Sequence, residues 1–179
     1  MSRIGKKPIQ ISNKIQVIIT GDSLSVKGPK GTLEKRLHPA VNVVVSDGVL
    51  TVDTVSKDRD TNALRGLFRA LIANMVTGVT TGFNRILLLN GIGYRAEVSG
   101  KKIVLNLGYS NPVNFDIPEG ITAQVEKNTQ ITLSGIDKEK LGETAARIRR
   151  LRPLEPYKGK GIMYSDERVI KKAGKAAAK

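Results

Sequence analysis

Residues 41–52 read VNVVVSDGVLTV, two β-rich runs on either side of a Ser-Asp-Gly turn, and they decide how the rest of the chain is interpreted. Runs of this kind around such a turn predict a β-hairpin. A helical pattern follows from Thr61 to Thr77. Residues 121–133, ITAQVEKNTQITL, repeat the arrangement with two alternating runs around Lys-Asn, and a helical pattern follows from Asp137 to Leu151. The order of hairpin and then helix therefore occurs twice, which indicates an approximate internal duplication.

Each predicted helix has an apolar stripe at helical spacing, which we expect to pack on a sheet. The stripes comprise Leu64, Leu67, Phe68, Leu71 and Met75 in the first helix and Leu141, Ala145 and Ile148 in the second.

Capping and stop residues mark the ends of the two predicted helices. Asp60 or Thr61 and, for the second helix, Asp137 are the candidate N-caps. Gly78 is a candidate stop for the first helix, and Pro153 should end the second.

Further strand-like runs precede each hairpin, so strands outnumber helices. We therefore predict an α+β fold of two tandem homologous domains, each an antiparallel or mixed sheet packed against one helix, with a basic C-terminal tail. The predicted boundaries are 1–82 for the first domain, 83–170 for the second and 171–179 for a flexible tail.

The composition points to a large anionic partner. Thirty Lys and Arg against sixteen Asp and Glu give the 179 residues a net charge of +14, which opposes compaction unless a polyanion is present. Nucleic acid, an anionic membrane surface and an acidic protein are all compatible with charge alone. The start MSRIGKKPIQIS has no apolar segment behind its basic residues, and no run approaches a membrane span, so we expect a soluble, intracellular protein.

Signals for metal or enzyme chemistry are weak. There is no cysteine, and the single histidine, His38, is expected in an exposed loop. Residues 91–96, GIGYRA, fit a dinucleotide-binding spacing, but the alternating residues after them predict a hairpin where the cofactor would need a helix. Neither 28–31, GPKG, nor 158–161, KGKG, has the spacing of a nucleotide phosphate loop. The first of these is a tight turn that is either inert or touches a phosphate. We expect no enzyme activity and no cofactor.

The basic charge gathers at the C-terminal end of the chain. From Arg147 to Lys179 eleven basic residues face three acids, a net charge of +8 in 33 residues. If the stripe of the second helix is buried, Arg147 and Arg150 point away from the sheet and Arg149 lies on the flank. Since Glu143 is the sole plausible partner within the helix, we expect these arginines to bind an external anion.

Residues 155–164, EPYKGKGIMY, follow that helix and are interrupted by prolines and glycines, unlike a membrane-surface helix. The glycines would let a phosphate approach the backbone and would leave amide groups free to donate. Tyr157 and Tyr164 could stack on a base or anchor the loop to the core. Aromatic residues make up only 4% of the chain, which favours structured, largely duplex RNA recognised by shape and phosphate contacts. The candidate RNA-binding residues are Arg147, Arg149, Arg150, Arg152, Tyr157, Lys158, Gly159, Lys160, Gly161, Tyr164, Lys171, Lys172 and Lys175.

LEPYKGKGI follows an arginine-rich helix, and SRIGKKPI, VKGPKG, LNGIGYRAEV and LGYSNPV precede it along the chain. LEPYKGKGI with that helix resembles the signature of the bacterial large-subunit ribosomal protein six family, and the other four segments resemble further segments of the family in the same order. The resemblance extends from Ser2 to about Lys172. Leu154, Ser12 and Asn111 depart mildly from the family pattern.

The resemblance implies two homologous α+β domains and binding of large-subunit rRNA, chiefly through the C-terminal domain. It also implies a position near the sarcin–ricin loop and the base of the factor-recruiting stalk of a cytoplasmic large ribosomal subunit. The expected partners are large-subunit rRNA, neighbouring ribosomal proteins and translation factors that bind nearby, with no membrane and no small-molecule substrate.

Overall fold

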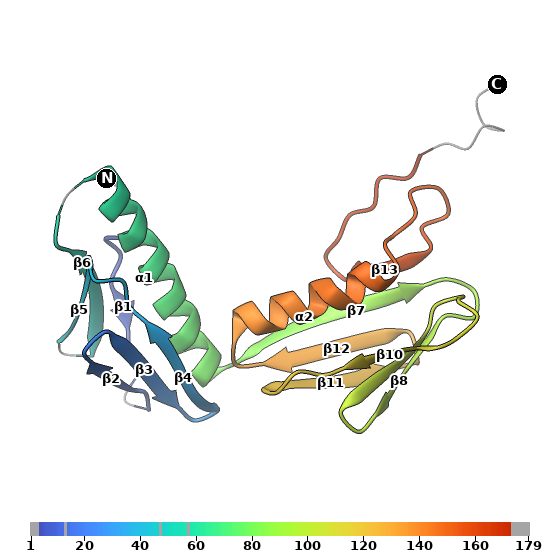
Figure 1. Ribbon diagram of the computed structural model, residues 1–179, viewed down its shortest axis with the longest axis horizontal. Helices are drawn as coiled ribbons and strands as arrows, with labels where there is room; N and C mark the ends of the chain where they lie inside the picture. Colours follow the sequence, from blue (N-terminus) through green and yellow to red (C-terminus); the bar gives the residue numbers. More distant parts are fainter. Residues whose placement is uncertain (1–3, 13, 47, 57, 173–179) are drawn as a thin grey trace. The chain divides into compact units, whose positions relative to one another are not determined.

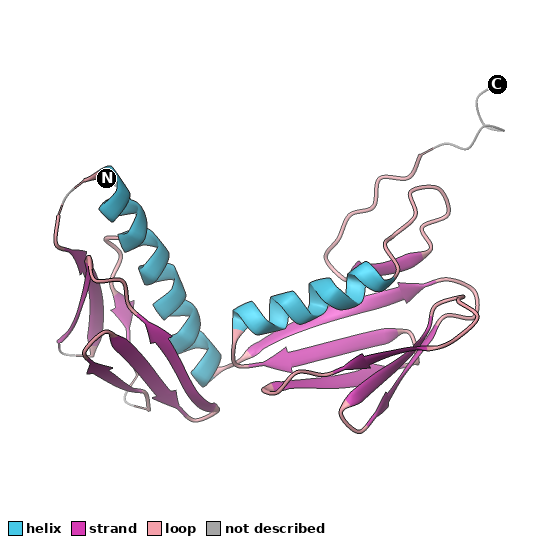
Figure 2. Ribbon diagram, viewed as in Figure 1, coloured by secondary structure: helices cyan, strands magenta, loops and turns pink. Residues whose placement is uncertain are grey.

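The computed structural model of the chain describes residues 4–12, 14–46, 48–56 and 58–172 (Figure 1). Its contacts divide the chain into two compact units. The first comprises residues up to Phe83 together with Ile136–Lys138, and the second comprises Asn84–Gly135 and the residues from Glu139 onward. Each unit combines β-strands with one long helix, as the colours of Figure 2 show, so the predicted α+β class with two tandem domains is confirmed.

The first unit contains two small antiparallel sheets and one helix. Its elements are β1 (Ile9–Gln10), β2 (Gln16–Thr20), β3 (Ser23–Gly28), β4 (Gly31–Arg36), β5 (Val41–Ser46), β6 (Val49–Thr54) and α1 (Arg59–Thr80). The strand orders are β1-β6-β5 and β2-β3-β4, so the strands form two sheets where we expected one. β5 and β6 pair as the predicted hairpin.

The buried face of α1 is broader than the predicted stripe. Phe68 and Met75 are buried as expected, and Ile72 joins them in a core that also contains Leu24. Leu67, however, is 52% exposed, so its assignment to the core was wrong. The face is centred on Phe68 and Ile72, and a residue one position before Phe68 lies about 100° to one side of it.

Both predicted ends of α1 were also wrong. The helix begins at Arg59 after Asp58, and the hydroxyl of Thr61 donates to the carbonyl oxygen of Asp58 from within the first turn. Gly78 does not stop the helix, which continues to Thr80. Gly78 is buried, and an added Cβ there would overlap the carbonyl oxygen of Ile136 in the same unit. The glycine therefore permits a close backbone approach inside the helix.

The second unit also contains two sheets and one helix. Its elements are β7 (Phe83–Asn90), β8 (Arg95–Ser99), β9 (Lys102–Asn106), β10 (Val113–Asp116), β11 (Ile121–Glu126), β12 (Gln130–Gly135), α2 (Lys138–Leu151) and β13 (Gly161–Tyr164). The strand orders are β10-β9-β8 and β11-β12-β7-β13. α2 begins directly after Asp137 and ends before Pro153, as predicted. β13 brings the end of the basic segment into the sheet beside β7.

Candidate nucleic-acid interface

The buried stripe of α2 determines where its arginines point. The predicted stripe is confirmed, since all three of its residues are at most 1% exposed: Leu141, Ala145 and Ile148. Arg147 and Arg150 are exposed, and neither pairs with an acid within the described part of the chain. The guanidinium carbon of Arg147 lies 5.9 Å from the centroid of the Phe115 ring, which supports its stem while leaving the charge accessible.

Arg149 contradicts the expectation that the helix arginines have almost no internal partner. Its Nε donates to Oε2 of Glu167 at 3.0 Å, and Nη2 donates to Oε1 of the same carboxylate. This hydrogen bonding raises the pKa of Arg149 and lowers the pKa of Glu167. The error arose because partners were sought only within the helix, whereas Glu167 is 18 residues further along the chain. Arg149 therefore fastens the segment after β13 to α2.

Arg152 and Tyr109 form a cluster at the C-terminal end of α2. The guanidinium carbon of Arg152 lies 4.9 Å from the ring centroid of Tyr109, and the Tyr109 hydroxyl donates to the carbonyl oxygen of Leu151 at 2.9 Å. Interaction with the side chains of Tyr109 first and Tyr94 second raises the pKa of Arg152, so the guanidinium stays charged. The tyrosine thus satisfies a helix-terminal carbonyl and orients the arginine. The sequence does not point to Tyr109, because the β9–β10 loop that carries it lies 42 residues before the end of α2.

The two glycines of KGKG have structural reasons within the protein. Gly159 has a φ of +71°, and its N–H donates to the carbonyl oxygen of Glu155 at 3.1 Å. Gly161 has a φ of +139°, and an added Cβ would lie 2.6 Å from the carbonyl oxygen of Pro153 and 2.7 Å from Cα of Leu154. The expectation that these glycines leave their amides free is therefore wrong for Gly159. Gly161 is required for close packing of the loop on itself.

Four lysines lie exposed on or beside this loop, and none pairs with a carboxylate among the described residues: Lys158, Lys160, Lys171 and Lys172. The N–H of Lys172 donates to the carbonyl oxygen of Pro156 at 3.0 Å, which brings residues 171 and 172 back to the loop. Lys175 and the rest of the predicted tail, 173–179, lie outside the described residues.

The structure distinguishes Tyr157 from Tyr164, for both of which the sequence left stacking on RNA and anchoring of the loop open. Tyr164 lies in β13 opposite Leu87, and its ring centroid is 5.8 Å from the guanidinium carbon of Arg85 and 5.7 Å from that of Arg149. These contacts favour the anchoring role for Tyr164. Tyr157 is 54% exposed, so its ring remains accessible for stacking.

The charges of the second unit are divided sharply along the chain. Residues 84–146 contain equal numbers of basic and acidic residues, whereas residues 147–179 carry a net charge of +8. Because Glu167 and Asp166 are paired with Arg149 and Arg85, the other cations of residues 147–172 have no ion pair in the described part of the chain. Such a surface attracts a polyanion through phosphate contacts.

Comparison with known proteins shows the family of this chain. A family model described as Ribosomal protein L6 matches residues 11–82 and 90–165. The chain belongs to the ribosomal protein L6 family. The large ribosomal subunit protein uL6 of Desulforapulum autotrophicum is 67% identical over 180 residues, which cover 100% of both chains. Proteins of the same name from Desulfatibacillum aliphaticivorans and Acaryochloris marina are 55% and 52% identical, covering 99% and 100% of this chain and 100% of each relative.

Ribosomal protein L6 is a structural component of the ribosome and not an enzyme, and the resemblance seen in the sequence is confirmed. The same family model matches one segment in each half of this L6-family chain, in agreement with the repeated hairpin-then-helix order.

Residues 28–31 and 91–96, whose sequences resemble nucleotide-binding motifs, have structural roles in this L6-family chain. Residues 28–31 form the tight turn between β3 and β4, where the N–H of Lys30 donates to the carbonyl oxygen of Val79 at 3.0 Å and its ammonium donates to that of Thr81. Residues 91–96 lead into the β8–β9 hairpin, as predicted, and not into a helix. Lys30 therefore binds the C-terminal end of α1.

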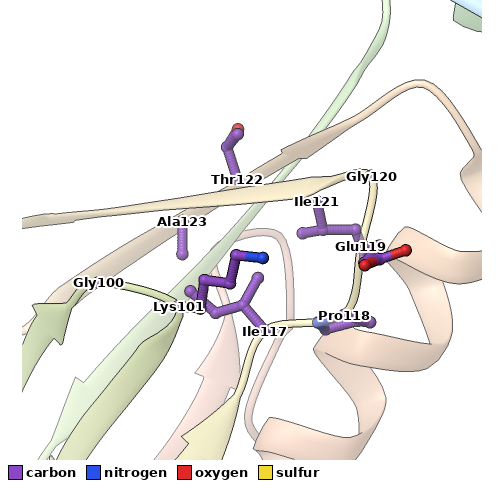
Figure 3. A pocket seen from close by; sticks show the side chains of 9 residues that line it. All are labelled: Gly100, Lys101, Ile117, Pro118, Glu119, Gly120, Ile121, Thr122 and Ala123. Atoms are coloured by element: carbon purple, nitrogen blue, oxygen red, sulfur yellow. The ribbon is translucent and has the colours of Figure 1, made fainter.

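Other features of the described residues give no competing site. No group of metal-ligating side chains and no helix long and apolar enough to cross a membrane occurs among them. A hollow of about 400 Å³ lies between the β8–β9 turn and the start of β11 (Figure 3). Its apolar wall includes Ile117 and Pro118, and it carries one cation, Lys101, and one acid, Glu119, so its charges balance.

Proposed function

We propose that this chain binds large-subunit rRNA through its C-terminal domain, residues 83–170, and stabilises the folded structure of that RNA for translation. The supporting observation is a group of exposed cations without acidic partners in the described residues: Arg147, Arg150, Lys158, Lys160, Lys171 and Lys172. Arginine offers forked contacts to phosphate oxygens and lysine offers point charges.

Two elements hold this group in place. α2 presents its arginines from a helix whose opposite face is fully buried. The loop after it is closed by the hydrogen bonds of Gly159 with Glu155 and of Lys172 with Pro156. A preorganised set of cations binds phosphates with less loss of side-chain entropy than a flexible tail does. We further propose that residues 171–179 extend this surface as a basic arm.

We also propose a position near the sarcin–ricin loop and the base of the factor-recruiting stalk of the cytoplasmic large subunit, beside other ribosomal proteins and close to translation factors. The family resemblance of the sequence supports this position, and the names of the curated relatives support the large subunit.

Salt dependence tests the phosphate contacts. If six to ten phosphates are neutralised, the affinity for deproteinised large-subunit rRNA should fall by roughly 10³- to 10⁵-fold between 50 and 200 mM salt. Replacing Arg150, Lys158 and Lys160 by Gln should reduce the slope of log affinity against log salt by about 2 to 3. Filter binding over a salt series measures both quantities.

A matched triple variant provides the control. Lys14, Lys27 and Lys101 are exposed and lie outside residues 147–179, and their replacement by Gln removes the same charge. If both triple variants lower the slope equally, net charge and not the C-terminal surface binds the RNA. A slope near zero for the wild-type chain would contradict the proposal altogether.

Tethered cleavage tests the position. Because the chain has no cysteine, Ser165→Cys gives a single attachment point for an iron chelate on an exposed turn after β13. In reconstituted large subunits, cleavage should cluster in rRNA around the sarcin–ricin loop. Cleavage confined to distant rRNA segments would refute the placement.

A further inference from the structure

Glu155 is an acid within the most basic part of the chain, and no contact among the described residues explains its carboxylate. Three acids occur between Arg147 and Lys179. Glu167 is bound to Arg149, and Asp166 pairs with Arg85 at 3.2 Å. The Glu155 carboxylate has no hydrogen bond or ion pair in the part of the chain that the structure describes. Since a carboxylate repels phosphate, the phosphate contacts proposed above give it no role.

Glu155 lines a hollow of about 300 Å³ at the C-terminal end of α2, together with Tyr109, Arg152, Pro153 and Lys160. This volume is at the lower end of the range for small-molecule sites. Two of the lining groups are planar, the guanidinium of Arg152 and the ring of Tyr109. They lie together, with the guanidinium carbon 4.9 Å from the ring centroid. Tyr109 is 46% exposed, so part of its surface remains available.

The backbone around Glu155 is fixed. Its N–H donates to the carbonyl oxygen of Lys160 at 2.8 Å, and its own carbonyl oxygen accepts from the N–H of Gly159 at 3.1 Å. Arg152 is held from the other side, because the Tyr109 hydroxyl binds the carbonyl oxygen of the neighbouring Leu151. The acid, the flat groups and the Lys160 ammonium are therefore set on a rigid loop and a helix end.

We propose that this hollow binds the base of an unpaired guanine in rRNA, which extends the rRNA binding proposed above and rests on it. The Glu155 carboxylate accepts hydrogen bonds from N1–H and N2–H of the base, the flat groups of Arg152 and Tyr109 stack on it, and Lys160 neutralises an adjoining phosphate.

The chemistry of the carboxylate selects guanine. An ionised carboxylate can only accept hydrogen bonds, and its two oxygens match two donors that lie side by side. Guanine is the standard base that presents two such donors on its Watson–Crick edge. Adenine, cytosine and uracil each present one donor beside at least one acceptor, which would oppose the carboxylate. In a paired guanine both donors are already used, so the guanine in this hollow is unpaired.

The direction in which Glu155→Gln changes the RNA affinity distinguishes this site from general phosphate binding. If the basic surface bound phosphates alone, Glu155→Gln would remove a repulsive charge and tighten binding. The proposed contact gives the opposite result, because the amide replaces one acceptor by a donor that faces the donors of the base. We expect a loss of about fivefold or more in affinity, the discrimination of a bidentate base contact.

The experiment compares the wild-type chain, Glu155→Gln and the control Glu143→Gln, which removes the same charge from an exposed position on α2. Filter binding to deproteinised large-subunit rRNA gives affinity and salt slope. Kethoxal, which reacts with N1 and N2 of unpaired guanine, reports on the bound edge. The wild-type chain and Glu143→Gln should protect at least one guanine that reacts in the complex with Glu155→Gln, with the same salt slope in all three.

A second measurement does not depend on the folding of a variant. In a synthetic RNA fragment carrying the protected guanine, inosine at that position lacks the N2 amine, and it should weaken binding of the wild-type chain but not of Glu155→Gln. Unchanged or tighter binding by Glu155→Gln with the same kethoxal pattern, or an inosine fragment bound as well as guanine by the wild-type chain, would overturn the guanine site. Those results would leave the salt-dependent rRNA binding intact, whereas binding that is insensitive to salt would overturn the proposed function itself.

Discussion

Substitution of Gly161 tests how tightly the loop between α2 and β13, residues 152–160, is packed. In Gly161→Ala the new Cβ would lie 2.6 Å from the Pro153 carbonyl oxygen and 2.7 Å from Cα of Leu154, so backbone must move. The φ of +139° adds conformational strain of roughly 1–3 kcal/mol, and overpacking adds roughly 1–3 kcal/mol. We therefore expect the free energy of unfolding to fall by about 2–6 kcal/mol.

Urea unfolding followed by circular dichroism measures this loss, and Gly159→Ala is the matched control. Gly159 also has a positive φ, +71°, but its nearest contact is the Lys171 Cε at 3.8 Å. Its replacement should cost about 1–2 kcal/mol, for strain without overlap. Equal stability of Gly161→Ala and the wild-type chain, combined with weaker RNA binding, would refute the packing argument and restore the view that the glycine makes room for an RNA phosphate.

Three further substitutions test other parts of the structure. Glu167→Gln should lower stability by about 1 kcal/mol at pH 7. The hydrogen bond with Arg149 lowers the pKa of Glu167 below its ordinary value of 4.5, so this stabilisation is present above that value and is lost as the pH falls through the lowered pKa. The melting temperatures of the wild-type chain and Glu167→Gln should therefore converge between pH 7 and pH 3. A difference in melting temperature that stays constant over this range would argue against the ion pair. Lys30→Met should cost roughly 0.5–1.5 kcal/mol, because α1 loses a C-terminal hydrogen bond, and it should leave the RNA salt slope unchanged; a lower slope would show that Lys30 contacts phosphate. Ile72→Ala should lower the free energy of unfolding by about 2–5 kcal/mol, whereas Leu67→Ala should lower it by under 1 kcal/mol. Similar urea midpoints for the two variants would contradict the assignment of Ile72 to the buried face of α1 and of Leu67 to its exposed side.

Local signals explain what could be predicted from the sequence. The hairpins at 41–52 and 121–133 follow from alternation and turn residues that are adjacent in sequence. The buried face of α2 follows from helical spacing, and Pro153 marks its end by steric exclusion. Each of these depends on a few neighbouring residues, so a pattern within one window is sufficient.

The error at Leu67 and the misplaced start of α1 are local, whereas the other main errors concern contacts between distant segments. The sequence predicts an unpaired Arg149 because its partner, Glu167, lies beyond the loop and strand that follow α2. The sequence predicts a helix stop at Gly78, whereas the glycine is required by the close approach of Ile136, which depends on tertiary structure. The cluster around Tyr109 joins a loop and a helix end 42 residues apart, and no local pattern marks it.

The pairing of β13 with β7 has a consequence for biosynthesis. β7 is the first strand of the second unit, yet it pairs with β13 on one side, and Gly161 lies 71 positions after its partner Asn90. Until residues 161–164 have left the exit tunnel, β7 presents an unpaired edge, and the folding of this unit must wait for them. One arginine and two lysines between α2 and β13 emerge in the same interval: Arg152, Lys158 and Lys160. The cations of this loop therefore reach their folded arrangement only as the sheet closes.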